Sequence, residues 1–192
     1  ISECLVGSEM CIRDRYRISD NKEESARIAR NFILGKVYNS RWILERATRD
    51  YAMRLDADRL KKKSAFLAQS IGKIRVCEKS DELLGLEGEA ASVYFSVFDD
   101  LILQQKEDFY FNGRNKRPPL DNVNAMLSFG YSLLAGMCGG ALEAVGLDPY
   151  VGFFLTDRPG RMSLALDLME EFRSVMAVSY THLRAHETLA NL

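Results

Sequence analysis

Helical periodicity is the feature that most constrains the fold of this 192-residue chain. Apolar residues recur at a spacing of three and four in most segments, and no alternation of period two lasts long enough to predict a sheet. The longest pattern predicts a helix from about Asp20 to Tyr51 or beyond, with an apolar face made of Ala29, Ile33, Val37, Leu44, Ala47 and Tyr51. We therefore predict an all-α fold.

Further helices follow from the same spacing and from residues that favour helix ends. Ser80 or Asp81, and also Ser163, are suited to be N-caps, and Gly146 is suited to end the helix that precedes it. We expect these helices at residues 56–76, 80–104, 121–145 and 164–177, with loops at 105–119 and 152–160.

The two ends of the chain are expected to lie outside the folded domain. Back-translated, residues 10–15 and 178–183 both fit the adapter of transposon-based sequencing libraries, on opposite strands. Residues 1–15 and 178–192 are therefore interpreted as adapter-like tails, and the alternative is two short natural tails. The remaining body, residues 16–177, is long enough for one domain with a hydrophobic core.

Removal of these tails changes the inventory of reactive residues. Both histidines, His182 and His186, lie in the C-terminal tail, so the body has none. Its two cysteines, Cys77 and Cys138, are far apart and have no metal-binding or redox spacing, which favours core thiols. We expect no stretch that is apolar for long enough to span a membrane, and therefore no membrane association and a cytoplasmic location.

The charge of the body is divided between its two halves. Residues 16–79 hold 16 Lys and Arg against 8 Asp and Glu, and residues 80–177 hold 7 against 15. A basic half beside an acidic half suggests phosphate binding next to a carboxylate site. Two solvated helix faces that happen to differ would give the same count.

Two acidic segments are candidates for a metal site. Glu87 lies on an apolar helix face between Gly85 and Gly88, where a carboxylate is costly unless it is paired or bound to a cation. Asp167 and Glu170 are three residues apart and share a helix face, an arrangement suited to Mg²⁺ or Mn²⁺. The alternatives are a glutamate at the rim of a helix end and the ordinary acidic face of an amphipathic helix.

A basic loop is the candidate for phosphate binding. Arg114 and Arg117 lie in this loop beside two prolines, and Tyr110 and Phe111 precede it. Such a loop can hold a nucleic-acid backbone, although basic loops are common on protein surfaces.

Three long stretches, in order, resemble one known family. The stretches GLEGEAASVYFSVFDDLI, FNGRNKRPPLDNVNAMLSFGYSLLAGMCGGALEAVGLDPYVGFF and TDRPGRMSLALDLMEEFR resemble successive parts of the CRISPR adaptation integrase, the Cas-one family. The resemblance covers nearly the whole body and looks closest to the version found beside type I systems. In that family a β-rich N-terminal domain precedes the helical catalytic domain, so we expect this chain to begin at the helical domain and to lack the β domain.

The resemblance implies an activity and partners. Family members form homodimers, and two dimers flank a dimer of the small partner subunit, the Cas-two protein. The complex holds a short spacer duplex of foreign DNA, and its 3′-hydroxyl ends attack phosphodiesters at the CRISPR repeat by metal-assisted transesterification. The same site can act as a DNA endonuclease with Mg²⁺ or Mn²⁺. The resemblance therefore implies a role in antiviral defence.

The resemblance also assigns roles to individual residues. The family's metal ligands are a glutamate, a histidine and an acidic residue, of which Glu87 matches the first and Glu170 the last, with Asp167 as an auxiliary acid. Tyr131 matches an aromatic residue close to the DNA. The basic loop associated with the substrate contains Arg114 and Arg117.

The sequence departs from the family pattern at the histidine, where Leu155 stands. Leucine cannot bind a metal ion, so we predict low or absent integrase and nuclease activity. A sequencing error is one explanation, because histidine and leucine codons can differ by one base. Two other functions stay open: a catalytically dead scaffold that binds DNA, and a helical interaction module with no DNA role.

Overall fold

The computed structural model describes residues 14, 16–115, 117–155 and 158–179. The described residues contain no strand, so the all-α prediction is confirmed. Most of both expected adapter-like tails, including His182 and His186, lies outside the described residues. The labelled elements are α2 (Lys22–Asp50), α3 (Ala57–Val76), α4 (Ser80–Phe95), the short 3₁₀ helix η1 (Asp99–Leu101), α5 (Asn122–Ala144) and α6 (Ser163–Met169), and residues 16–20 and 173–179 are also helical.

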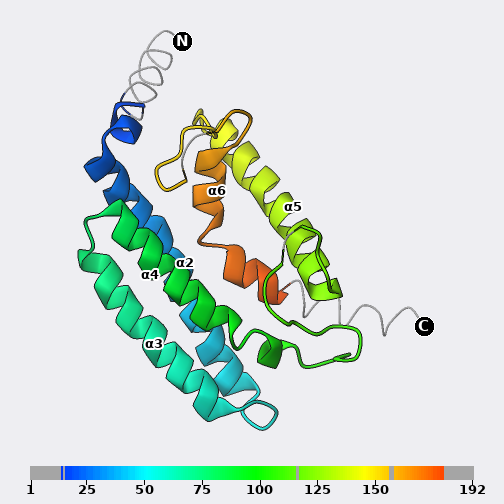
Figure 1. Cartoon of the computed structure of the whole chain (residues 1–192). Coiled ribbons are helices and arrows are strands. Elements are labelled where there is room, and N and C mark those ends of the chain that lie inside the picture. The colour runs from blue at the N-terminus through cyan, green and yellow to red at the C-terminus, as the bar shows by residue number, and fades with distance from the viewer. Residues whose placement is uncertain (1–13, 15, 116, 156–157, 180–192) are drawn as a thin grey trace.

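The helices form two groups that meet along α2. Helices α2, α3 and α4 pack against one another, α5 pairs with α6, and α2 contacts α6 (Figure 1). The three-helix group has a core of fully buried side chains such as Ile33, Leu67 and Phe98. A second cluster joins α5 to α6 through Leu134 and Met169, among others. Burial of these apolar faces is the main stabilising contribution to the arrangement.

Some helix ends follow the local signals of the sequence, but the expected cap at Ser80 or Asp81 was wrong, because Lys79 is the N-cap of α4 and makes no side-chain cap hydrogen bond. Asn21, one residue after the expected Asp20, caps α2 by accepting hydrogen bonds from two backbone N–H groups. Asp121 caps α5 in the same way. Gly146 has a φ of +73°, the left-handed conformation that glycine adopts readily after a helix.

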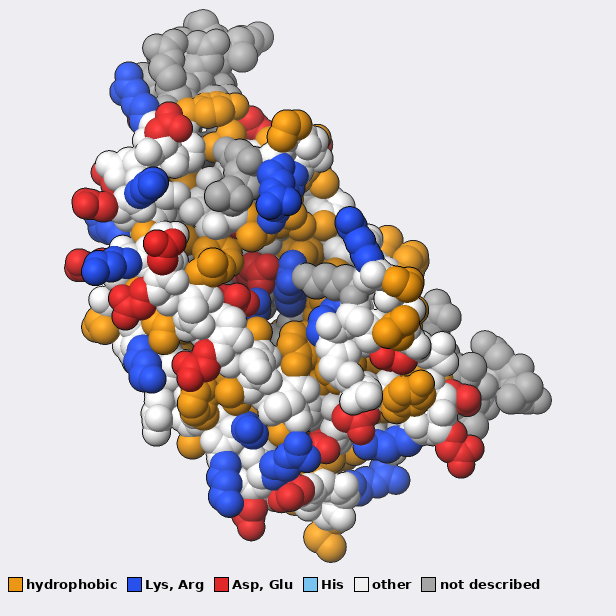
Figure 2. All heavy atoms as spheres, in the orientation of Figure 1, with side chains coloured by type: hydrophobic (Ala, Val, Ile, Leu, Met, Phe, Trp, Pro, Cys, Tyr) orange, Lys and Arg blue, Asp and Glu red, His pale blue; other side chains and the backbone are white. Residues whose placement is uncertain are grey.

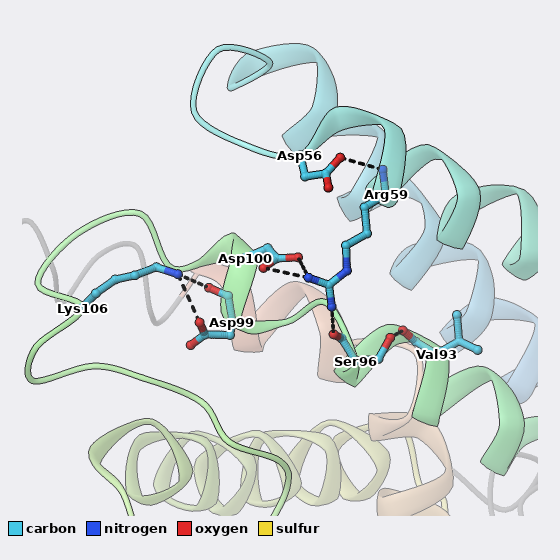
Figure 3. Close-up of polar contacts among 7 residues, drawn as sticks. All are labelled: Asp56, Arg59, Val93, Ser96, Asp99, Asp100 and Lys106. Atoms are coloured by element: carbon cyan, nitrogen blue, oxygen red, sulfur yellow. Dashed lines mark hydrogen bonds and ion pairs between the residues drawn. The ribbon is translucent and has the colours of Figure 1, made fainter.

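Helix α4 ends at Phe95, so the expectation that it would extend to about Gln104 was wrong. Arg59 of α3 donates a 2.9 Å hydrogen bond to the carbonyl of Ser96 and forms a 3.1 Å ion pair with Asp100 (Figure 3). Asp99 accepts a 2.7 Å hydrogen bond from the backbone N–H of Phe111. These contacts come from distant parts of the chain, and they hold the backbone in η1 and the following loop.

The last expected helix, residues 164–177, is also interrupted. Helix α6 ends at Met169, and helical structure resumes at residues 173–179. Asn39 of α2 donates a 2.8 Å hydrogen bond to the carbonyl of Glu171, within the interruption. Gly35 of α2 leaves space for the side chain of Glu171, because a Cβ at Gly35 would lie 2.8 Å from Glu171 Cγ. Contact with α2 therefore favours the break. The N-cap is Met162 rather than the expected Ser163.

Helix α5 contradicts the expectation that no segment is apolar enough to span a membrane. Among the described residues, α5 is one helix that meets this criterion by length and composition. Its buried face packs on α6 through Leu134, Cys138 and Leu142, while Phe129 and Met137 are exposed. Length and composition do not distinguish a membrane span from the core helix of a water-soluble protein.

Candidate functional site

A cavity of about 180 Å³ lies between the two helix groups. In the space-filling view, acidic and basic side chains gather in a depression in the middle of the molecule (Figure 2). Helices α2, α3, α4 and α5, the basic loop and the segment after α6 all contribute to the lining of the cavity. Its polar lining includes Lys36, Ser40, Glu87, Tyr94, Arg114, Tyr131 and Arg173.

Glu87 projects into this cavity from the interior of α4. The helix runs from Ser80 to Phe95, so the alternative of a glutamate at a helix end is wrong. The side chain is only 16% exposed and forms an ion pair with Lys36 of α2. Gly85 and Gly88 have no other group near the position of a Cβ, so among the described residues no backbone approaches them closely.

Glu170 forms an ion pair with the same lysine. It follows the last residue of α6, and its side chain is 5% exposed. Its Oε2 atom lies 2.7 Å from Lys36 Nζ, and its Oε1 atom lies 3.1 Å from Arg173. Two nearly buried carboxylates therefore converge on one ammonium group. Such a pair is costly to bury unless a cation neutralises it.

Two arginines, Arg114 and Arg173, also line the cavity. Arg114 donates hydrogen bonds to the side-chain oxygen of Asn124 and to the hydroxyl of Ser128, at 2.7 and 3.3 Å. The guanidinium groups of Arg114 and Arg173 lie 5.6 and 5.2 Å from the centre of the Tyr131 ring. Burial lowers the pKa of Arg114, and the nearby Arg173 acts in the same direction. These arginines give the cavity a surplus of positive charge suited to an anion.

Asp167 has a structural role beside the cavity. Its side chain is fully buried and accepts hydrogen bonds from the backbone N–H groups of Phe153, Phe154 and Leu155, at 2.7, 2.9 and 3.1 Å. Burial raises the pKa of Asp167 to about 6, although the three N–H groups act in the opposite direction. Asp167 thus fixes the loop that carries Leu155.

Comparison with known proteins identifies the family of this chain. Residues 5–183 match the family model described as CRISPR associated protein Cas1. The chain belongs to the Cas1 family. It is 46% identical, over 168 residues, to the CRISPR-associated endonuclease Cas1 1 of Chlorobaculum tepidum, a match that covers 88% of this chain and 49% of that relative. The chain spans about half the length of the curated Cas1 relatives it matches first.

Solved structures share the fold. A casposase bound to its integration product has a TM-score of 0.74 and 30% identity, covering 91% of this chain and 49% of that one. A Cas6-RT-Cas1–Cas2 complex has a TM-score of 0.78 and 25% identity, covering 92% of this chain and 18% of that one.

The structure brings together only some of the residues that the Cas1 resemblance assigned. Glu87, Arg114 and Tyr131 line the cavity, and Glu170 borders it through Lys36. Arg117 is exposed and, like Leu155 and Asp167, is not among the lining residues of the described part of the chain. The described residues contain no group of three or more His, Cys, Asp or Glu side chains that could hold a metal ion.

Two charged residues of the cavity were missed by the sequence analysis. Lys36 lies within the apolar stripe of α2, three residues after Ile33, where a lysine should have indicated a buried partner. Arg173 is three residues after Glu170, a spacing that permits the observed ion pair. Neither signal identifies the partner Glu87, which lies 51 residues from Lys36.

Proposed function

We propose that this chain is the helical catalytic part of a metal-dependent DNA integrase and endonuclease that inserts spacers into a CRISPR array. The observation that carries this proposal is the convergence of Glu87 and Glu170 on one cation in a cavity with surplus positive charge. Support for a DNA substrate comes from the relative named an endonuclease and from the casposase bound to an integration product.

The two carboxylates fit a divalent cation. Both aim at the same ammonium group, and the buried Oε2 atom of Glu170 has no hydrogen-bond donor beyond this ion pair. Glu87 and Glu170 would hold Mg²⁺ or Mn²⁺, which prefer oxygen ligands. When bound, the ion would polarise the scissile phosphate and stabilise the leaving oxygen.

The arginines would bind and orient the DNA backbone. Arg114 and Arg173 supply positive charge on the side of the cavity that Tyr131 forms. The hydrogen bonds of Arg114 to Asn124 and Ser128 hold its guanidinium group in place, which reduces the entropy lost when a phosphate binds. Arg117, exposed on the same loop, would contact the backbone further from the reacting atoms.

The partners belong to the same proposal. A homodimer of the full-length protein, assembled with a Cas2 subunit and a spacer duplex, would place the cavity at the CRISPR repeat. Support for the Cas2 partner comes from the structurally similar Cas6-RT-Cas1–Cas2 complex.

Leu155 should weaken the activity of this chain. Leucine at this position provides no nitrogen ligand, whereas the family resemblance implies a histidine there. A catalytically dead scaffold that binds DNA is therefore the second candidate function, and Leu155 is the observation that favours it.

Comparison of the wild type with Leu155→His tests the proposal. We expect Leu155→His to increase Mn²⁺-dependent cleavage or strand transfer at least tenfold, because imidazole is a good ligand for divalent metals. Leu155→Gln is the matched control, since it is polar but a poor ligand. Addition of Glu87→Gln to Leu155→His should abolish the gain. Equal activity of the wild type and Leu155→His would contradict a role for this position in metal binding.

A further inference from the structure

Lys36 occupies the point at which the two site carboxylates meet. Its Nζ atom lies 2.7 Å from Glu170 Oε2 and also pairs with Glu87, and its side chain is 14% exposed. A divalent cation held by the same two carboxylates would need this position. The same site can therefore hold either the ammonium group of Lys36 or a divalent metal ion.

We propose that Lys36 is a built-in competitor of the metal ion, which rests on the function proposed above. In the metal-free protein its ammonium group pairs with both Glu87 and Glu170, and Arg173 supplies a second positive charge to Glu170. A divalent cation binds only when the ammonium group leaves the two carboxylates. Lys36 thereby sets the metal concentration at which the site fills.

The ion-pair network permits this displacement. Glu170 has a second partner, Arg173, at 3.1 Å, so it stays paired when Lys36 leaves. Among the described residues, Glu87 pairs with Lys36 alone, so it needs a replacement cation. The cavity of about 180 Å³ adjoins the lysine and gives its side chain room to move.

A lysine at position 36 is easier for a metal ion to displace than an arginine would be. Lysine carries a compact charge on a flexible four-carbon stem, whereas arginine holds carboxylates with a rigid fork of donors. Repulsion between the ammonium group and an incoming divalent cation is strong here, because charges in a nearly buried site are poorly screened.

The test measures Mn²⁺ binding to the full 192-residue chain rather than activity. Free Mn²⁺ is followed by electron paramagnetic resonance for the wild type, Lys36→Gln, Lys36→Met and Lys36→Arg, with far-UV circular dichroism in EDTA to check the fold. Lys36→Gln keeps a hydrogen-bond donor for the carboxylates but no charge. We expect both neutral variants to bind Mn²⁺ about tenfold more tightly than the wild type, or more, and Lys36→Arg to bind no more tightly.

Each contrary outcome has a distinct meaning. If Glu87→Gln abolishes Mn²⁺ binding but folded Lys36→Gln binds no more tightly than the wild type, the competition is refuted and the metal site stands. If no variant shows Mn²⁺ binding that depends on Glu87, both this inference and the proposed metal site fail. If the neutral variants fold neither with nor without Mn²⁺, the ion pairs of Lys36 are required for the fold, and the inference is also overturned.

Discussion

Replacement of Asp167 by alanine tests how the loop that carries Leu155 is held. The carboxylate of Asp167 is fully buried and accepts hydrogen bonds from the backbone N–H groups of Phe153, Phe154 and Leu155. Alanine removes the acceptor for all three groups. The loop must then either leave three donors without a partner or open to water.

The expected cost follows from these hydrogen bonds. Each buried donor left without an acceptor costs ~1–3 kcal/mol, so even the lower end gives a loss of ~3 kcal/mol for Asp167→Ala. This loss is a large part of the ~5–15 kcal/mol that stabilises a typical domain. For a chain of this size it corresponds to a decrease in Tm of roughly 6–12 °C.

Urea unfolding followed by circular dichroism at 222 nm measures this loss, and hydrogen exchange of the three amides shows where it arises. Asp167→Asn is the matched variant: it keeps the shape and one acceptor oxygen, so it should lose less than half as much. Asp108→Ala, at an exposed position, should change stability by less than ~0.5 kcal/mol. A loss below ~1 kcal/mol for Asp167→Ala, with the three amides still protected, would refute the reasoning.

Two further predictions concern the same region and its surroundings. Gly152→Ala should destabilise the protein by ~1–3 kcal/mol, because a Cβ there would lie 2.6 Å from Ser163 Cβ. Gly88→Ala should instead stabilise the protein by ~0.5–1 kcal/mol, because the position lies in open space on α4 and alanine favours a helix more than glycine does. Thermal melts of both variants check this, and shifts of the same sign would contradict it. Burial raises the pKa of Asp167 from 3.8 to about 6, so the folded protein favours the neutral carboxyl. The contribution of Asp167 to the unfolding free energy should therefore fall as the pH rises from about 4 to about 6. Asp167→Asn should lack this fall in EDTA-containing buffers, so parallel pH profiles for the two proteins would argue against it.

The sequence by itself determined the helical architecture and the family. Helical periodicity reports which face of a segment is buried, so it located α2 and placed Glu87 on an apolar face. Glycine adopts the left-handed conformation readily, and for this reason Gly146 marked the end of α5 correctly. The N-caps expected at Ser80 or Asp81 and at Ser163 were wrong. The order of the three stretches that resemble the Cas-one family indicated the family that residues 5–183 match.

The tertiary structure decided where helices stop and which charges meet. Helix α4 ends early because Arg59 of α3 binds the turn that follows it, a contact absent from any local pattern. Asp167, expected beside the metal, faces the loop of Leu155, whereas Lys36 joins Glu87 to Glu170 across 51 and 134 residues of chain. Periodicity shows that a side chain is buried but not which distant group will be its partner, because that depends on how the helices pack.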